Sequence, residues 1–278
     1  MPRLVRSLLA AVGLVALVAA AGCAEERTAP PPEPNSSESA SASPGVTLPP
    51  IGADCRDQAL QGLTLRLVNA AGLSISAVDL GSGPLGVVLA HQSDASLCQW
   101  MPYAKVLASR GYRVLAFDFA GYGSSSQPRQ KTYVEDLRTA VAYLRDRGTT
   151  HVVIIGASMG ATMSVVAAAA ITPPVDGVIA LSPPVTFDGV NAEKAAPSLK
   201  SPALYVAGQT DGDYEVYAKS INDATPADLR DLLVVPAPQH GIQFVSSDTS
   251  AGSQVRAAIE AFLLAHLRVT PSPSTTPR

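Results

Sequence analysis

The chain has 278 residues and a formal net charge of −3; 47% of its residues are hydrophobic and 15% are charged. This length allows one large domain or two small ones, and the apolar content is sufficient for a large core. The small net charge and the lack of a basic stripe argue against nucleic-acid binding. No His/Cys cluster has metal-ligand spacing, so we expect neither a metal nor a cofactor.

Residues 1–22 have the organisation of an export signal, with two early arginines followed by the apolar run Leu8–Ala21. That run is short for a transmembrane helix. Small residues stand before Cys23, an arrangement that resembles the bacterial lipobox. The resemblance implies cleavage before Cys23 and acylation of its thiol, as with palmitate, although Ala20 occupies a position where Leu is preferred. An ordinary secretory signal with an incidental Cys23 is the alternative.

Residues 23–50 are rich in Pro, Ser, Ala and Glu and contain almost no large apolar side chain. Such a segment cannot bury enough surface to fold, so we expect a flexible tether after the lipidated cysteine. The tether would hold a single domain, residues 51–268, at the outer face of the cell membrane. The Pro/Ser/Thr-rich tail, residues 269–278, is expected to be disordered.

The domain opens with two segments that alternate apolar and polar residues, Leu63–Asn69 and Leu73–Leu80, which predict an antiparallel strand pair. Buried strands and helices then alternate. The predicted strands are Val87–Ala90, Arg113–Phe119, Val152–Ile155, Gly177–Leu181, Ala203–Ala207 and Leu232–Val235. A helix is expected at Tyr133–Arg147, and another ends the domain. This pattern predicts an α/β fold with a mainly parallel sheet, helices on both faces, and ligands at the carboxyl ends of the strands.

The stretch "HVVIIGASMGATM" places Ser158 between two glycines, where a buried strand becomes a helix. A sharp turn at this point strains one residue, and strand and helix approach closely, so Gly156 and Gly160 avoid clashes. The Ser158 hydroxyl would be held up on the bend. The Met159 N–H would point at the same space from the helix N-terminus, where negative charge is favoured. This is the arrangement of an acyl-transfer nucleophile with one oxyanion donor.

A serine nucleophile needs a base, and the chain has four histidines. His240 lies in a loop just after the last predicted strand, at the same edge of the sheet as Ser158, and is the expected base. His151 opens a strand at the opposite edge, and His266 sits in the last helical turn. His91 ends the first parallel strand but precedes the serine.

The acid that orients His240 should follow a strand between the serine and the histidine. Asp211 comes shortly after the strand Ala203–Ala207 and is the preferred residue. Asp213 is a close rival, although it could equally begin the next helix as its N-cap. Asp188 is a third and weaker alternative.

The order Ser158, Asp211, His240 resembles that of the α/β-hydrolases, over about residues 63–267. The stretch "FDFAGYGSSS" is similar to that family's Asp-x-Arg-Gly-x-Gly-x-Ser loop, with Ala120 at the Arg position. The matching residues are Asp118, Gly121, Gly123 and Ser125. The resemblance implies a serine hydrolase, closest to the small lidless esterases and dienelactone-hydrolase-like proteins.

The stretch "VVLAHQSDASLCQW" resembles the family's oxyanion loop, which normally reads His-Gly-x; here it reads His91-Gln92-Ser93. By position, the Ser93 N–H would join that of Met159 as the second oxyanion donor. Gln92 replaces a glycine and cannot adopt glycine conformations cheaply, so the Gln92 N–H is the alternative donor.

Residues 183–202 leave room for a loop or one short helix but not for a cap domain, so the pocket should be open. Trp100, Met101 and Tyr103 could line this pocket or could pack a helix against the sheet. Cys55 and Cys98 are expected to form a disulfide in an oxidising compartment. Two free thiols are the alternative, because the sequence does not supply the distance between them.

These patterns predict an extracytoplasmic, membrane-anchored serine hydrolase that cleaves small-molecule or lipid esters or thioesters through an acyl-enzyme. The first alternative is a lipoprotein that keeps the fold only to bind a ligand, motivated by the altered oxyanion loop. The second is an envelope acyltransferase with the same triad. The acyl chain length and the oligomeric state stay open.

Overall fold

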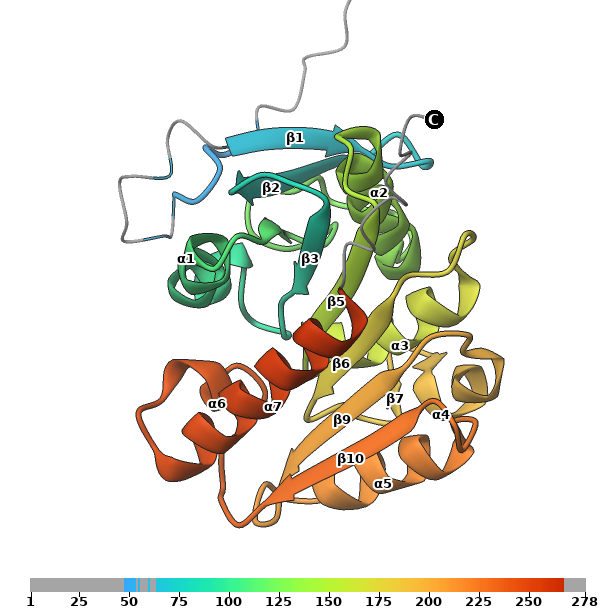
Figure 1. Cartoon of the computed structure of the whole chain (residues 1–278). Helices are drawn as coiled ribbons and strands as arrows, with labels where there is room; N and C mark the ends of the chain where they lie inside the picture. The colour runs from blue at the N-terminus through green and yellow to red at the C-terminus, as the bar shows by residue number, and fades with distance from the viewer. Residues whose placement is uncertain (1–47, 54, 56–59, 61–63, 268–278) are drawn as a thin grey trace, which may run out of the picture. The chain divides into compact units, whose positions relative to one another are not determined.

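The computed structural model describes residues 48–53, 55, 60 and 64–267. The predicted export signal, Cys23 and the tail 269–278 lie outside these residues. An eight-stranded sheet forms the centre of the described part, in the order β1-β2-β4-β3-β5-β6-β9-β10 (Figure 1). The strands are β1 (Thr64–Val68), β2 (Ser74–Leu80), β3 (Leu85–Ala90), β4 (Arg113–Phe117), β5 (His151–Ala157), β6 (Gly177–Leu181), β9 (Ala203–Gly208) and β10 (Arg230–Val235).

Strands β1 and β2 pair antiparallel, and β2 also runs antiparallel to β4. All the other neighbours in this sheet are parallel. The predicted α/β fold class, with its antiparallel pair at one side, is therefore confirmed. Each predicted strand is present, with ends displaced by up to two residues, as at β4, which stops at Phe117 instead of Phe119.

Helices cover both faces of the sheet. The face with α1 (Met101–Ser109), α6 (Gln243–Ser246) and α7 (Ser250–His266) forms one apolar cluster. The face with α2 (Tyr133–Asp146), α3 (Met159–Ala170) and α5 (Tyr214–Ala224) forms the other. Successive strand side chains alternate between the two clusters, because a strand points neighbouring residues to opposite faces. This arrangement explains why the strands are continuously apolar in sequence.

The chain changes direction across the sheet at β3. Strand β3 pairs with β4 on one side and with β5 on the other. The chain runs from β3 to β4 on one side, and from β5 to β6 on the opposite side. Such a switch point leaves a crevice outside the carboxyl ends of the strands, where ligands of open α/β sheets bind. Ser158 follows β5 directly, and His91 follows β3, so both predicted loops begin at this point.

The segment between β6 and β9 contains more structure than the expected loop or single short helix. It forms a hairpin of β7 (Thr186–Phe187) and β8 (Val190–Asn191), then the short helix α4 (Ala192–Ala195) and the 3-10 turn η3 (Ala196–Ser198). The hairpin turn is Asp188-Gly189, and both residues have positive φ, as a tight two-residue turn requires. Strands of two residues are too short to show a period in sequence.

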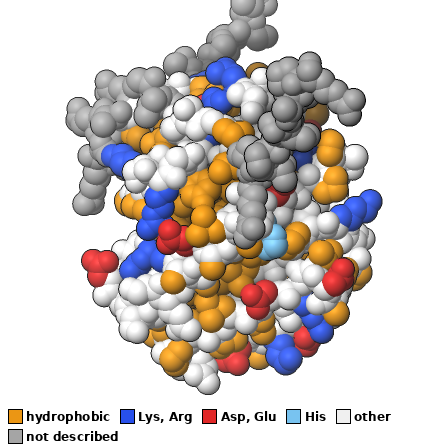
Figure 2. Space-filling view, in the orientation of Figure 1, with side chains coloured by type: hydrophobic (Ala, Val, Ile, Leu, Met, Phe, Trp, Pro, Cys, Tyr) orange, Lys and Arg blue, Asp and Glu red, His pale blue; other side chains and the backbone are white. Residues whose placement is uncertain are grey.

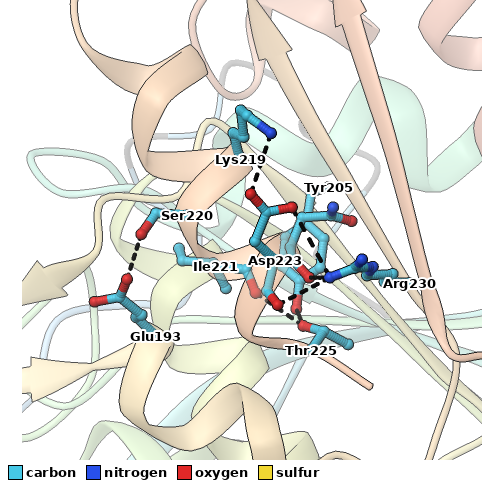
Figure 3. A network of polar contacts seen from close by, with 9 residues as sticks. Glu193, Tyr205, Lys219, Ser220, Ile221, Asp223, Thr225 and Arg230 are labelled. Atoms are coloured by element: carbon cyan, nitrogen blue, oxygen red, sulfur yellow. Dashed lines mark hydrogen bonds and ion pairs between the residues drawn. The ribbon is translucent and has the colours of Figure 1, made fainter. Parts of the chain in front are cut away.

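The C-terminal end of α5 is fixed to the two outermost parallel strands (Figure 3). The Tyr205 hydroxyl of β9 lies 2.7 Å from Thr225 Oγ1, and the Thr225 hydroxyl donates to the Ile221 carbonyl. Arg230, at the start of β10, donates to the Asp223 carbonyl. Burial raises the pKa of Tyr205 to about 12, so this hydroxyl stays protonated. Together these contacts fix the C-terminal end of α5 against β9 and β10.

The predicted disulfide is present: Cys55 and Cys98 are bonded, with their Cα atoms 5.0 Å apart. Cys98 belongs to η2 (Leu97–Trp100), the 3-10 turn before α1. Trp100, Met101 and Tyr103 are buried in the cluster under α1 and α7, so their packing role is confirmed.

On the face drawn in Figure 2, hydrophobic side chains gather across the middle, and charged side chains of both signs are scattered around them. None of the helices in the described part of the chain is long and apolar enough to span a membrane.

Candidate active site

Ser158 sits in a strained turn between β5 and α3, with φ 48° and ψ −115°. Residues other than glycine rarely adopt this backbone conformation, and backbone strain of this kind is typical of functional sites. The glycines on either side are required by close packing. A Cβ on Gly156 would lie 2.3 Å from the Gly160 carbonyl oxygen, and one on Gly160 would lie 2.4 Å from that of Ala90. The turn therefore has the geometry predicted for a nucleophile.

The first turn of α3 faces the same space. Met159 is the first residue of this helix, and the first N–H groups of a helix have no partner within it. The Ser158 N–H itself is used, since it donates to the Leu181 carbonyl at 2.8 Å. That bond fixes the turn to the end of β6. The Met159 N–H therefore lies at the positively polarised N-terminus of α3, where the sequence predicts an oxyanion donor.

His240 and Asp211 form the hydrogen-bonded pair that a triad requires. His240 Nδ1 lies 2.9 Å from Asp211 Oδ2 and 3.2 Å from Oδ1. Gly208, at the end of β9, permits this approach, because a Cβ there would lie 2.4 Å from the Ala237 carbonyl oxygen. Asp213 is the N-cap residue of α5, and its carboxylate contacts Tyr217 instead. Of the two rival acids, the geometry selects Asp211.

The loop of His240 lies against the nucleophile turn. A Cβ on Gly241 would stand 3.4 Å from Ala157 Cβ and 3.6 Å from the Ser158 nitrogen. Among the described residues, Ser158 Oγ and His240 form no direct hydrogen bond. A hydrogen bond between a nucleophile and its base commonly forms or tightens only when the substrate is bound, so its absence here does not exclude His240 as the base.

The oxyanion loop is held from beneath by His91, which is fully buried. The Phe119 N–H can only donate, so His91 Nε2 accepts it at 3.0 Å and the ring carries its proton on Nδ1. That proton is donated to the Gln92 carbonyl at 2.7 Å. Neither Gln92 nor Ser93 has a positive φ; the left-handed residue of this loop is Asp94, with φ 55°. Gln92 is thus accommodated without a glycine conformation.

The loop after β4 supports the oxyanion loop. Asp118, buried at its start, accepts the Leu97 N–H at 2.7 Å and the Ser124 N–H at 2.9 Å. Gly123 passes so close to this carboxylate that a Cβ would lie 2.3 Å from its oxygen. The predicted motif is therefore structural: one carboxylate ties the β4 loop to η2, which follows the oxyanion loop.

The remaining candidates lie elsewhere. His151 pairs with Asp176 at 2.8 Å, at the opposite end of β5 from Ser158. Asp188 is in the hairpin turn, where its carboxylate accepts a hydrogen bond from the Tyr133 hydroxyl at 2.8 Å and forms an ion pair with Lys131. In the described ranges, no three His, Cys, Asp or Glu side chains gather as a metal site would require.

Two residues that contact Asp211 or His240 were not predicted from the sequence. The Ser182 hydroxyl lies 2.8 Å from Asp211 Oδ2, and the Tyr214 ring packs edge-on against the His240 ring, with centroids 4.3 Å apart. Ser182 follows β6 directly, as Ser158 follows β5, so its position at a strand end was the available signal. Tyr214 opens α5, and nothing in its sequence context marks it.

Known proteins share the fold of this chain. Residues 87–203 match the family described as alpha/beta hydrolase fold. An esterase of Pyrococcus furiosus superposes with a TM-score of 0.64 at 18% identity, covering 80% of this chain and 98% of that one. The chain has the α/β-hydrolase fold. A dienelactone hydrolase of Anabaena variabilis has a TM-score of 0.59 at 22% identity, covering 74% of this chain and 97% of its own.

Sequence relatives match over shorter segments. Epoxide hydrolase B of Mycobacterium tuberculosis is 35% identical over 132 residues, which is 45% of this chain and 37% of that protein. Rat bifunctional epoxide hydrolase 2 is 36% identical over 88 residues, which is 31% of this chain and 16% of that protein. The matched segments thus span little more than a third of these relatives at most.

Proposed function

We propose that this chain is a serine hydrolase that cleaves carboxylic esters or thioesters through an acyl-enzyme on Ser158. The observation that carries the proposal is the His240–Asp211 pair at 2.9 Å, on a loop packed against the strained turn of Ser158. Ser158, Asp211 and His240 follow the strands β5, β9 and β10, which supports their assignment as nucleophile, orienting acid and base of covalent acyl transfer.

In the proposed reaction, Ser158 Oγ attacks the carbonyl carbon while His240 Nε2 removes its proton. Asp211 accepts the Nδ1 proton of His240, which fixes the tautomer and stabilises the imidazolium that forms. The Met159 and Ser93 N–H groups receive the developing oxyanion. His240 then returns the proton to the leaving alcohol or thiol, and water, activated by the same base, hydrolyses the acyl-enzyme.

The same site is less suited to epoxides, the substrate class named for two relatives. Attack by Ser158 on an epoxide carbon would give an ether. An ether has no carbonyl carbon for water to attack, so His240 and the oxyanion donors could not release the product. An ester or thioester leaves an acyl group that these residues can hydrolyse. Esters are therefore the substrates that this set of residues turns over.

Labelling of full-length protein in detergent with a fluorophosphonate tests the proposal. The wild type should react, and Ser158→Ala and His240→Ala should not, because the probe needs an activated serine and an oxyanion hole. Asp213→Asn is the matched control and should label normally. A folded wild type that neither labels nor hydrolyses any ester or thioester would contradict the proposal and favour the non-catalytic binding protein.

We also propose that the chain is exported and held at the outer face of the cell membrane by acylation of Cys23. The signal-like N-terminus motivates this, and the Cys55–Cys98 disulfide supports it, because such bonds persist mainly outside the cytoplasm. Cells grown with an alkyne-labelled palmitate should incorporate it into the wild type but not into Cys23→Ser. Equal incorporation in both, or none in either, would contradict the lipid anchor.

A further inference from the structure

The carboxylate of Asp211 has a second partner besides His240. Ser182 Oγ lies 2.8 Å from Asp211 Oδ2, the same oxygen that His240 Nδ1 approaches at 2.9 Å. Ser182 is fully buried, whereas the His240 side chain keeps 26% of its surface exposed. The serine therefore approaches the carboxylate from inside the protein and leaves the imidazole free to face the nucleophile.

The two hydrogen bonds of Ser182 Oγ determine the direction of its hydroxyl proton. The Gly241 N–H lies 3.1 Å from Ser182 Oγ, and a backbone N–H can only donate, so Oγ accepts there. An ionised carboxylate can only accept, so the Ser182 hydroxyl proton points at Asp211. His240 and Gly241 are neighbours in the chain. Ser182, Asp211, His240 and Gly241 therefore close a ring of three hydrogen bonds and one stretch of backbone.

The backbone of Ser182 is strained to make this contact. Its φ is 48°, in the left-handed region that side chains other than glycine seldom occupy. Its N–H donates to the Val206 carbonyl at 2.8 Å, which fixes the residue to the end of β9. Ser158 has the same φ one strand earlier. Strain that the surrounding structure maintains is typical of functional positions.

We propose that Ser182 is a positioning residue of the triad, whose hydroxyl holds the Asp211 carboxylate and the backbone after His240 in one closed ring. This inference rests on the proposed hydrolase function. Ser182 acts through Asp211, because it donates to the carboxylate and accepts from the loop of His240. It sets the carboxylate orientation, and it shares the negative charge that would otherwise act on the imidazole alone.

Within the described part of the chain, two titratable side chains contact the His240 imidazole. The Asp211 carboxylate contacts it from the β9 loop, and the Tyr214 phenol packs on it from α5. Tyr217 and Asp213 lie behind Tyr214. Gln243, which is uncharged, accepts the His240 backbone N–H. A change at Ser182 should therefore reach His240 through Asp211.

Two substitutions separate the hydroxyl from the backbone strain. Ser182→Ala removes the hydroxyl and keeps a Cβ at positive φ, whereas Ser182→Gly removes the hydroxyl and relieves the strain. If the hydroxyl acts as proposed, both variants lose kcat by about tenfold to a hundredfold with KM little changed, because a hydrogen bond to a charged group is lost. Ser201→Ala, which removes another buried serine hydroxyl bonded only to a carbonyl, should keep its kcat.

The pH profile provides a readout that a merely structural role would not move. Without Ser182, the charge of Asp211 acts on His240 alone and stabilises the imidazolium. The acidic limb of kcat/KM should therefore move to higher pH in both Ser182 variants and stay in place in Ser201→Ala. An acidic limb at the wild-type position in an active Ser182→Gly protein would overturn the inference and leave the hydrolase proposal intact.

An NMR measurement of full-length protein keeps the test independent of activity. The His240 Nδ1 proton should give a far-downfield resonance at low pH, and its shift should change in Ser182→Ala and Ser182→Gly but not in Ser201→Ala. If the wild type hydrolyses nothing, the proposed function fails while this resonance still decides whether Ser182 orders the pair. An unchanged resonance in both Ser182 variants would overturn the inference.

Discussion

Gly160 in α3 passes so close to Ala90 in β3 that a Cβ on Gly160 would lie 2.4 Å from the Ala90 carbonyl oxygen. The same Cβ would lie 2.6 Å from the His91 carbonyl oxygen. The start of the nucleophile helix therefore rests directly on the strand that leads into the oxyanion loop. The two proposed oxyanion donors, the Met159 and Ser93 N–H groups, would take their relative position from this contact.

Gly160→Ala should destabilise the protein by about 1–3 kcal/mol, the usual cost of overpacking. Helix propensity alone predicts the opposite sign, since alanine exceeds glycine by up to about 1 kcal/mol in a helix. Urea unfolding distinguishes the two. In the same helix, Ala169→Gly is the comparison, and it should lose the propensity difference together with the packing of one partly buried methyl group. A Gly160→Ala protein as stable as the wild type would show that α3 and β3 can separate without cost.

Asp211→Asn should lower kcat by about 10³–10⁴ with the fold intact, because the amide holds His240 in the wrong tautomer or not at all. Asp213→Asn, two residues away, should stay within about twofold of the wild type, because Asp213 contacts Tyr217 and not the imidazole. Steady-state hydrolysis of a chromogenic ester measures both. Equal losses in the two variants would be inconsistent with the assignment of Asp211.

Tyr214→Ala should lower kcat by about tenfold, because the edge-on ring that packs on His240 is removed and the imidazole gains freedom. Tyr214→Phe keeps the ring and should retain nearly all activity, which separates packing from any action of the phenol. The same ester assay is used, with thermal unfolding as the check on the fold. A large loss in Tyr214→Phe would assign the effect to the hydroxyl instead.

Asp136 should make stability fall as the pH rises through its titration. Burial raises its pKa above the ordinary 3.8, although the Ala120 N–H, Asn69 and Thr132 all donate to it. The folded state thus binds the proton more tightly than the unfolded state. The contribution of Asp136 to the free energy of unfolding is therefore highest below pH 3.8 and declines as the pH passes the raised pKa.

Asp136→Asn removes this dependence, because the amide does not titrate. Urea unfolding of both proteins from about pH 3 to about pH 7 should show the wild type losing stability relative to the variant as the pH rises. The variant also carries a constant cost, since its NH₂ group must face one of the three donors. A difference that stays flat, or that grows in favour of the wild type at higher pH, would contradict the prediction.

The sheet and the strained turn at Ser158 were predictable because their signals are local. A parallel strand buried on both faces is continuously apolar, and each such stretch in the sequence became a strand. The glycines beside Ser158 could be interpreted from one pentapeptide, because the turn, the strand and the helix it joins are contiguous. The position of the His240 loop followed from the rule that ligands of open α/β sheets bind at the carboxyl ends of the strands.

The sequence favoured Asp211 but left Asp213 as a rival, because the choice depends on where the loop after β9 ends and α5 begins. The Cys55–Cys98 bond likewise depends on a distance between segments 43 residues apart. Ser182 looked like an ordinary loop serine in "LSPPV", and its role appears only when the ends of β6, β9 and β10 are brought together. Contacts between distant loops are set by the whole sheet.

The disulfide also determines what a break in the backbone would do. Cys55 and Cys98 bracket the whole of β1, β2 and β3. A protease that cuts once anywhere between them would leave two fragments joined through sulfur, and the nicked molecule would separate on a gel only after reduction. Everything upstream of Cys55 would stay covalently attached to the part of the protein that carries Ser158 and His240, despite the nick.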